Sequence, residues 1–176
     1  MDITEKIIEA IGEEIWQKGT VFSDMLTFEK EVREACEKNY CGCYGKCWTC
    51  PPYVGDLDTM KQKLSAYSSV FVFTTKHELE DSFDYEGMQE AHRKHDAITK
   101  RIKNICAENN ALILSAGRCN ICEKCTCPDA PCRFPDKAVV SIEACGINVM
   151  QLSKDVGINY INGSDTVTYF TAVLYN

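Results

Sequence analysis

The sequence predicts an α/β (or α+β) protein, in which a small sheet with a βαβ core is flanked by helices and carries two cysteine-rich metal-binding loops. Segments 69–75, 84–108 and 111–116 predict a strand, a helix and a strand in succession. The first is rich in β-branched and aromatic residues, the second is long and charged, and the third is apolar. Cysteines gather at residues 36–53 and 117–136. The second of these loops begins where the second strand ends, which is where open α/β sheets carry their binding loops.

The first part of the chain is predicted to be helical. Isoleucines from residue 3 to residue 15 lie on one stripe of a helix over residues 3–16, and Gly19 is a plausible stop. A second helix is expected over residues 27–38. We therefore expect residues 1–27 to form an N-terminal helical extension. Prolines close the first cysteine loop and exclude helix or central strand there, and a third helix is expected over residues 56–66.

The second half predicts a regular arrangement around the sheet. The strand, helix and strand between residues 69 and 116 predict a right-handed crossover between parallel strands. A helix is expected over residues 141–154 and a final strand over 166–174, with a short strand at 158–161. No linker or internal repeat interrupts the chain, so residues 1–176 are expected to form a single domain.

Charge and hydropathy exclude several classes of partner. The chain has 19 Lys+Arg and 26 Asp+Glu, a net charge of −7. Binding to phosphate backbones requires clustered cations, so we expect neither nucleic acid nor an anionic membrane as a partner. The first residues are acidic, unlike a signal peptide, and no apolar stretch is long enough to span a bilayer. We therefore expect a cytoplasmic protein, in which the twelve cysteines remain reduced and bind metal or perform redox chemistry.

The strongest motif is the run Cys119-x-x-Cys122-x-x-Cys125 in the second loop. Two-residue gaps bring successive thiolates to three corners of one cluster, as in the ferredoxins that hold a 4Fe–4S cube. A fourth thiolate is needed, and Cys127 and Cys132 are the local candidates. We favour Cys132, because a single residue between Cys125 and Cys127 strains their joint ligation of one cube.

The first loop supplies a second set of thiols. It contains Cys36, Cys41, Cys43, Cys47 and Cys50. Cys145, near the start of the last predicted helix, is a distant thiol that could complete either site. The alternative to iron is zinc, because Cys47-x-x-Cys50 and Cys122-x-x-Cys125 resemble the paired ligands of a zinc ribbon. Surplus thiols and the triple run favour iron.

Other polar and sulfur-containing residues have weaker claims to a site. His92 and His95 lie three residues apart on one helix and could form a metal pair, but their charged neighbours favour a solvated helix face. Cys106 is interpreted as a buried apolar residue. Cations flank the second loop and could offset the charge of a thiolate-bound cluster; they are Arg118, Arg133 and Lys137.

The combined motifs resemble the family of predicted metal-binding proteins called domain of unknown function 2284. The matching segments are Cys41-x-x-Tyr44-x-x-x-Trp48-x-Cys50-Pro51-Pro52, Cys119-x-x-Cys122-x-x-Cys125, Pro131-Cys132-Arg133-Phe134-Pro135, residues 141–147 and the terminal strand at 167–170. The resemblance extends from about residue 28 to the C-terminus. It implies metal binding by cysteines, in a family common in anaerobic bacteria and methanogens, and it supplies no established reaction.

Carried over by position, the resemblance implies metal ligands at Cys36, Cys41, Cys50, Cys119, Cys122, Cys125, Cys132 and Cys145. Cys119, Cys122, Cys125 and Cys132 are assigned to one cube, and Cys36, Cys41, Cys50 and Cys145 to a second. Cys43 and Cys47 are surplus to that pattern: they are either spare thiols or replacements for a ligand.

The predicted function is electron transfer by one or two 4Fe–4S clusters with a redox protein as partner. The alternatives are a zinc-binding structural or interaction module, and an iron–sulfur enzyme or thiol reductase acting on an unknown small molecule. No nucleophile–base pair is evident in the sequence, so an electron carrier is favoured over an enzyme.

Overall fold

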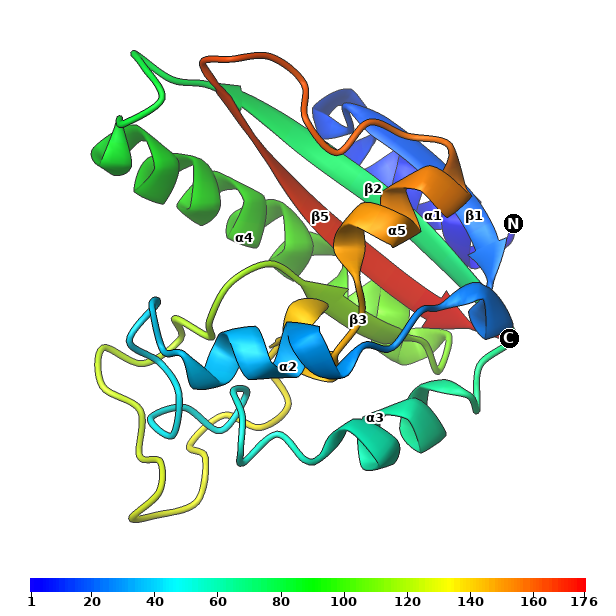
Figure 1. The fold of residues 1–176 in the computed structure, drawn as a ribbon. Coiled ribbons are helices and arrows are strands. Elements are labelled where there is room, and N and C mark those ends of the chain that lie inside the picture. The colour runs from blue at the N-terminus through cyan, green and yellow to red at the C-terminus, as the bar shows by residue number, and fades with distance from the viewer.

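A five-stranded sheet forms the centre of the protein, and helices cover both of its faces (Figure 1). The computed structural model describes all of residues 1–176. In chain order the elements are α1 (Ile3–Ile11), β1 (Gln17–Phe22), α2 (Lys30–Glu37), α3 (Leu57–Leu64), β2 (Ser69–Glu78), α4 (Tyr85–Glu108), β3 (Leu112–Ser115), β4 (Val140–Ser141), α5 (Val149–Val156) and β5 (Thr166–Tyr175). The mixed α/β class is therefore confirmed.

The order of strands differs from the predicted βαβ unit. The order is β1-β2-β5-β3-β4, and only β3 and β4 pair in parallel. Strands β2 and β3 run in the same direction, as expected, but β5 lies between them and is antiparallel to both. The parallel direction of β2 and β3 is confirmed, but the two strands do not pair directly, because β5 lies between them and pairs with all ten residues of β2.

The segment 1–27 is only partly helical. Helix α1 ends at Ile11, and residues 17–22 form the edge strand β1, which the sequence analysis did not predict. Only Val21 of β1 is buried, so its hydrophobic pattern is weak. Helix α2 begins at Lys30 rather than near residue 27, because Phe28 forms an antiparallel bridge with Ile147 and keeps the preceding chain extended.

The predicted helix over residues 141–154 is divided. Residues Val140–Ser141 pair with β3, and Glu143–Cys145 form a short 3₁₀ turn, here called η3, before α5 begins at Val149. Gly146 has φ +82°, which no α-helix accommodates, and therefore separates the two parts. The predicted short strand at 158–161 is also absent: these residues form a connection to β5.

Alternating side chains on the strands build a core on each face of the sheet. On β2, Phe71 and Phe73 face α1 and α4, while Val70 and Val72 face α3, η3 and α5. Phe73, Val70 and Val72 are fully buried. None of the helices, including the 24-residue α4, is apolar over a stretch that could cross a membrane.

Candidate metal centre

The two cysteine-rich loops lie against each other beyond the end of β3, below α4 in Figure 1. The Trp48 indole nitrogen of the first loop donates a hydrogen bond to the Ala130 carbonyl oxygen of the second, at 3.0 Å. Arg118 of the second loop lies close enough to Cys43 of the first for its charge to oppose the rise in the pKa of that thiol. Segments about seventy residues apart in the sequence are thereby held side by side.

Five cysteines line one pocket between the loops. They are Cys47, Cys119, Cys122, Cys125 and Cys132. The remaining walls are largely apolar and include Trp48, Ile121 and Phe134. All four thiols of the first predicted set therefore face the same pocket. Cys47, which the sequence analysis treated as surplus, joins them from the other loop.

The pocket begins at a sharp turn after β3. Gly117 has φ +72°, a left-handed conformation that glycine adopts without steric cost. A Cβ atom at this position would lie 2.5 Å from His92 Nε2. That nitrogen is 2.9 Å from the Ala116 carbonyl oxygen, so the turn is hydrogen-bonded to α4. The turn directs the chain from β3 into the second cysteine loop.

Substitution Gly117→Ala is expected to lower the free energy of unfolding by about 1–2 kcal/mol, the cost of placing a side chain in the left-handed region. Displacement of His92 adds to this loss. Urea unfolding under reducing conditions measures the change. The control is Gly12→Ala, since Gly12 has φ −59° and its added Cβ would make only a 3.4 Å contact. Equal effects of the two substitutions would contradict the importance of this turn.

The thiols of the pocket interact electrostatically with one another. Burial raises the pKa of Cys119, and the nearby Cys47, Cys132 and Cys122 raise it further, because each adjacent thiolate disfavours another. In contrast, the pKa of Cys47 is lowered to about 5, because Cys50, Thr49 and Cys125 hydrogen-bond to its thiolate. Cys50 consequently retains its proton, and its pKa is raised.

This donor set fits a soft metal ion or an iron–sulfur cluster. The pocket lining includes five thiols and no carboxylate, and thiolates are the ligands of zinc and of iron–sulfur clusters. All twelve cysteines are free thiols. As they stand, no three His, Cys, Asp or Glu side chains are placed to hold one metal ion.

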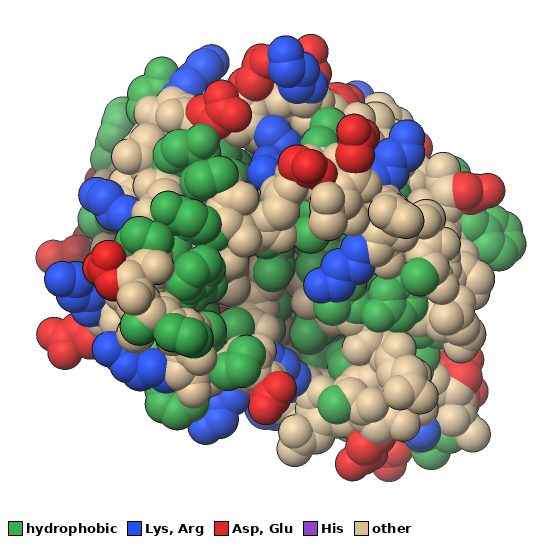
Figure 2. Space-filling view, turned by 90° about the horizontal axis from the view of Figure 1, so that it is seen from below, with side chains coloured by type: hydrophobic (Ala, Val, Ile, Leu, Met, Phe, Trp, Pro, Cys, Tyr) green, Lys and Arg blue, Asp and Glu red, His purple; other side chains and the backbone are tan.

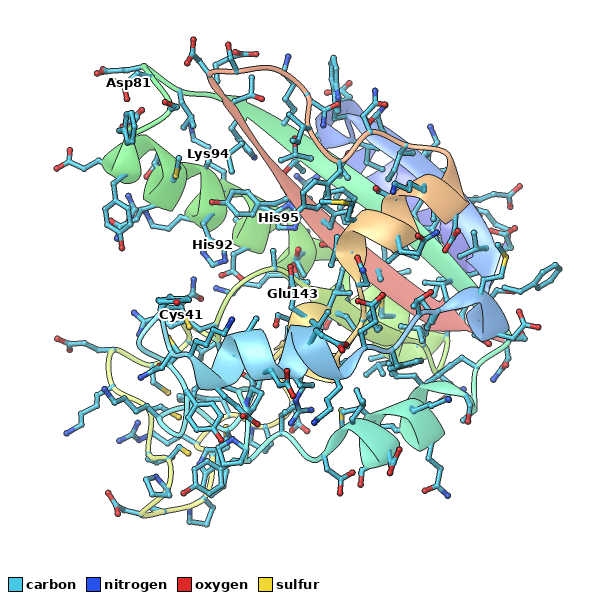
Figure 3. All side chains as sticks on the ribbon, viewed as in Figure 1. Cys41, Asp81, His92, Lys94, His95 and Glu143 are labelled. Carbon is cyan, nitrogen blue, oxygen red and sulfur yellow. The ribbon has the colours of Figure 1, made fainter.

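The second predicted set of ligands is less closely grouped. Cys36, in α2, lies near Cys41 and Glu143, and its pKa is raised mainly by burial. Cys145, in η3, is 1 % exposed and belongs to the core beneath the sheet, where burial raises its pKa to about 12. Figure 3 shows Cys41 and Glu143 between α4 and α2. Cys50 instead faces Cys47.

Arg33 ties the elements around this second set together. Its guanidinium donates to the Ala144 carbonyl oxygen at 3.1 Å and to the Gly55 carbonyl oxygen at 2.7 Å. It thus links α2 to η3 and to the end of the first loop.

The remaining cysteines have distinct surroundings. Cys43 is buried, and its thiol lies 3.4 Å from the Cys41 carbonyl oxygen. Cys127 is also buried, near Cys125 and Cys47. Cys106 packs in the core between α1, α4 and the sheet, which confirms its interpretation as an apolar residue.

The histidines are not on a solvated helix face. His95 is fully buried and hydrogen-bonds to Thr75 and Thr171, while His92 is half-buried against the Ala116 carbonyl oxygen. The interpretation based on charged neighbours is therefore wrong for His95. The useful signal was the buried stripe of α4, which comprises Ala91, His95, Ile98, Thr99, Ile102 and Cys106.

The sheet and the thiol-lined pocket define the class: a cysteine-rich α/β protein in which thiols from two loops line one pocket. The chain belongs to the family described as predicted metal-binding protein, domain of unknown function 2284, whose model matches residues 20–175. This confirms the resemblance found in the sequence. No curated protein and no solved structure matches the chain.

Proposed function

We propose that the protein is a cytoplasmic electron carrier that holds a 4Fe–4S cluster in the pocket between the two loops. The observation that carries this proposal is the convergence of the Cys119, Cys122 and Cys125 run with Cys132 on one pocket. The spacing within that run is typical of bacterial-type cube ligation. When bound, such a cluster accepts and releases single electrons. Cys36, Cys41, Cys50 and Cys145 remain the predicted ligands of a second cube.

The protein around the pocket supplies shielding and charge compensation. Trp48, Ile121 and Phe134 line it, and hydrophobic walls limit water access and so tune reduction potential. Arg133 also lines the pocket and donates a hydrogen bond to the Lys124 carbonyl oxygen at 2.9 Å, which fixes its position in the loop. A cation at this place offsets the negative charge of thiolate ligands.

The surface around the loops supports a protein partner. Tyr40 is 90 % exposed, Tyr53 44 % and Phe134 41 %. Exposed aromatic residues are enriched at protein interfaces. Figure 2 shows hydrophobic side chains gathered on the left part of the lower face, with lysines and arginines along its edge. A redox protein that contacts this surface would come close to the pocket.

Purification and reconstitution without oxygen test the proposal. Roughly four iron and four sulfide per chain are expected from the pocket cluster, and roughly eight of each if the second set also binds one. Its visible absorption should bleach with dithionite. The Cys125→Ser variant is expected to lose the pocket cluster.

Zinc is the second candidate, favoured by the contact of Cys47 with both Cys50 and Cys125. Closed zinc sites of four thiolates stabilise a fold and have no redox activity. A colourless protein that retains only zinc, and unfolds when the zinc is chelated, would overturn the electron-carrier proposal in favour of this one.

A further inference from the structure

All three histidines of the chain lie together near Tyr169 of β5. His95 reaches from α4 toward the sheet, as Figure 3 shows, and is fully buried. Its Nδ1 is 2.7 Å from the Thr75 hydroxyl oxygen, and its Nε2 is 2.9 Å from the Thr171 hydroxyl oxygen. The same Thr75 oxygen lies 2.9 Å from His77 Nε2. A line of hydrogen bonds therefore passes through the buried imidazole.

The line continues across the sheet to β3. Thr171 is 3.1 Å from the Ser115 hydroxyl oxygen and 3.2 Å from that of Thr99. Ser115 is the last residue of β3 and precedes the second cysteine loop. Elsewhere this face of the sheet is filled by apolar side chains. A buried polar network is costly unless all its members are satisfied, and here every buried polar side-chain atom has a hydrogen-bond partner.

The other end of the line opens into a cavity of about 550 Å³. Its walls come from the 3₁₀ turn after α1, the two residues before β1, the end of β2 and the middle of α4. Thr75 and His77 lie at its base, beside Trp16, Lys94 and Ile98. Sites for small organic ligands are typically about 300–1,000 Å³, lined by apolar groups with a few polar ones. The cavity has this size, and four of its ten lining residues are hydrophobic, so polar and charged groups make up more of its lining than in a typical site.

The charges of the cavity favour an anion at the His77 end. Lys94 lies close enough for its charge to lower the pKa of His77, an effect second only to burial. Arg93 and Lys100 on the same helix are paired with Glu90 and Asp96, whereas Lys94 forms no ion pair.

The acidic end of the cavity is largely compensated. Glu14 forms an ion pair with Arg101 of α4. Arg101 lies about two helical turns after Lys94 in the same helix. Lys76 is 4.7 Å from the centre of the Trp16 ring and 3.0 Å from a Glu78 carboxylate oxygen. The carboxylate of Glu13, an exposed residue that also lines the cavity, forms no ion pair.

We propose that this cavity binds a small organic anion, with its negative group between Lys94 and His77 and its apolar part against Trp16 and Ile98. The Nε2 of His77 is engaged by Thr75, which leaves Nδ1 free for the ligand. An anion accepts a hydrogen bond, so binding selects the neutral tautomer of His77 that carries its proton on Nδ1.

That choice fixes the tautomer of the buried His95. A hydroxyl group has one hydrogen. If the Thr75 hydroxyl group donates its hydrogen to His77 Nε2, the Thr75 oxygen can only accept a hydrogen bond from His95. His95 must then carry a proton on Nδ1 and donate it to Thr75. His95 Nε2 then accepts from Thr171, whose oxygen accepts from Ser115 or Thr99. An anion in the cavity thus reorients hydrogen bonds as far as the end of β3, without any change of charge at His95.

Nitrogen NMR of the full chain, purified without oxygen and labelled with ¹⁵N-histidine, tests the site and the coupling. Benzoate and inorganic phosphate are the probes. Benzoate is expected to bind saturably and to shift the His77 resonances, and phosphate to bind more weakly because it lacks an apolar part. The Lys94→Gln variant is expected to bind benzoate at least about tenfold less tightly, the loss typical of one charged hydrogen-bonding partner. Lys100→Gln, on the same helix but outside the cavity, serves as the control.

The buried histidine provides the second measurement. With benzoate bound, the His95 nitrogen shifts should move to those of the Nδ1–H tautomer, and in Thr75→Val benzoate should bind without moving them. The proposal is overturned if neither probe titrates, if Lys94→Gln and Lys100→Gln bind benzoate equally, or if His95 is unaffected by bound benzoate in the wild-type chain. None of these measurements depends on whether the protein holds a metal, so their failure is distinguishable from a failure of the proposed function.

Discussion

Substitution Cys47→Ser is expected to weaken retention of the bound metal group about 10- to 100-fold, the range found for residues that support metal ligands. Cys47 lines the pocket with the thiols of the second loop, and Cys125 is among the groups that lower its pKa. Serine at this position removes either a ligand or the partner of one. The measurement is the rate and midpoint of metal loss to a chelator, under oxygen-free conditions.

Cys43→Ser is a closely matched control for this prediction. Cys43 and Cys47 belong to the same loop, and each is 5 % exposed. Only Cys47 lines the pocket, whereas the Cys43 thiol points to the Cys41 carbonyl oxygen. Cys43→Ser should therefore keep the metal as the wild type does. Equal losses in both variants would show that loop stability, rather than the pocket thiol, controls retention.

A second large effect is expected in acid. Burial lowers the pKa of His95 to about 3, and the nearby His92 and His77 contribute in the same direction. In the unfolded chain the pKa returns to about 6.5. Between these values the unfolded state binds a proton that the folded state does not. The free energy of unfolding should therefore fall with decreasing pH from about 6.5, by up to about 1.4 kcal/mol per pH unit.

The slope of unfolding free energy against pH isolates this effect. Urea unfolding of the reduced protein at pH 6.5, 5.5 and 4.5 is compared for wild type, His95→Gln and His92→Gln. His95→Gln should be less stable at pH 6.5 but lose stability less steeply in acid. His92→Gln should keep most of the wild-type slope, because burial is the main cause of the low pKa of His95 and His92 makes a smaller contribution to it. Parallel slopes for wild type and His95→Gln would refute the assignment.

Local patterns predicted most elements of the fold. The helix α3, the strand β2 and the long helix α4 lie where spacing and residue type place them, with small shifts at their ends. These features depend on neighbouring residues alone. The strand β1 was not predicted because only Val21 is buried in it, so its sequence lacks a clear hydrophobic alternation. This edge strand forms through backbone pairing with β2.

The amino-acid sequence by itself determined that this is an α/β protein with two cysteine-rich loops, because cysteine spacing and hydrophobic periodicity are local properties of single segments. Only the tertiary structure decided that β5 separates β2 from β3, that Cys47 joins the thiols of the other loop, and that His95 is buried. Each of these depends on contacts between segments far apart in the chain. Such contacts are chosen by how whole surfaces pack, and no local pattern contains that information.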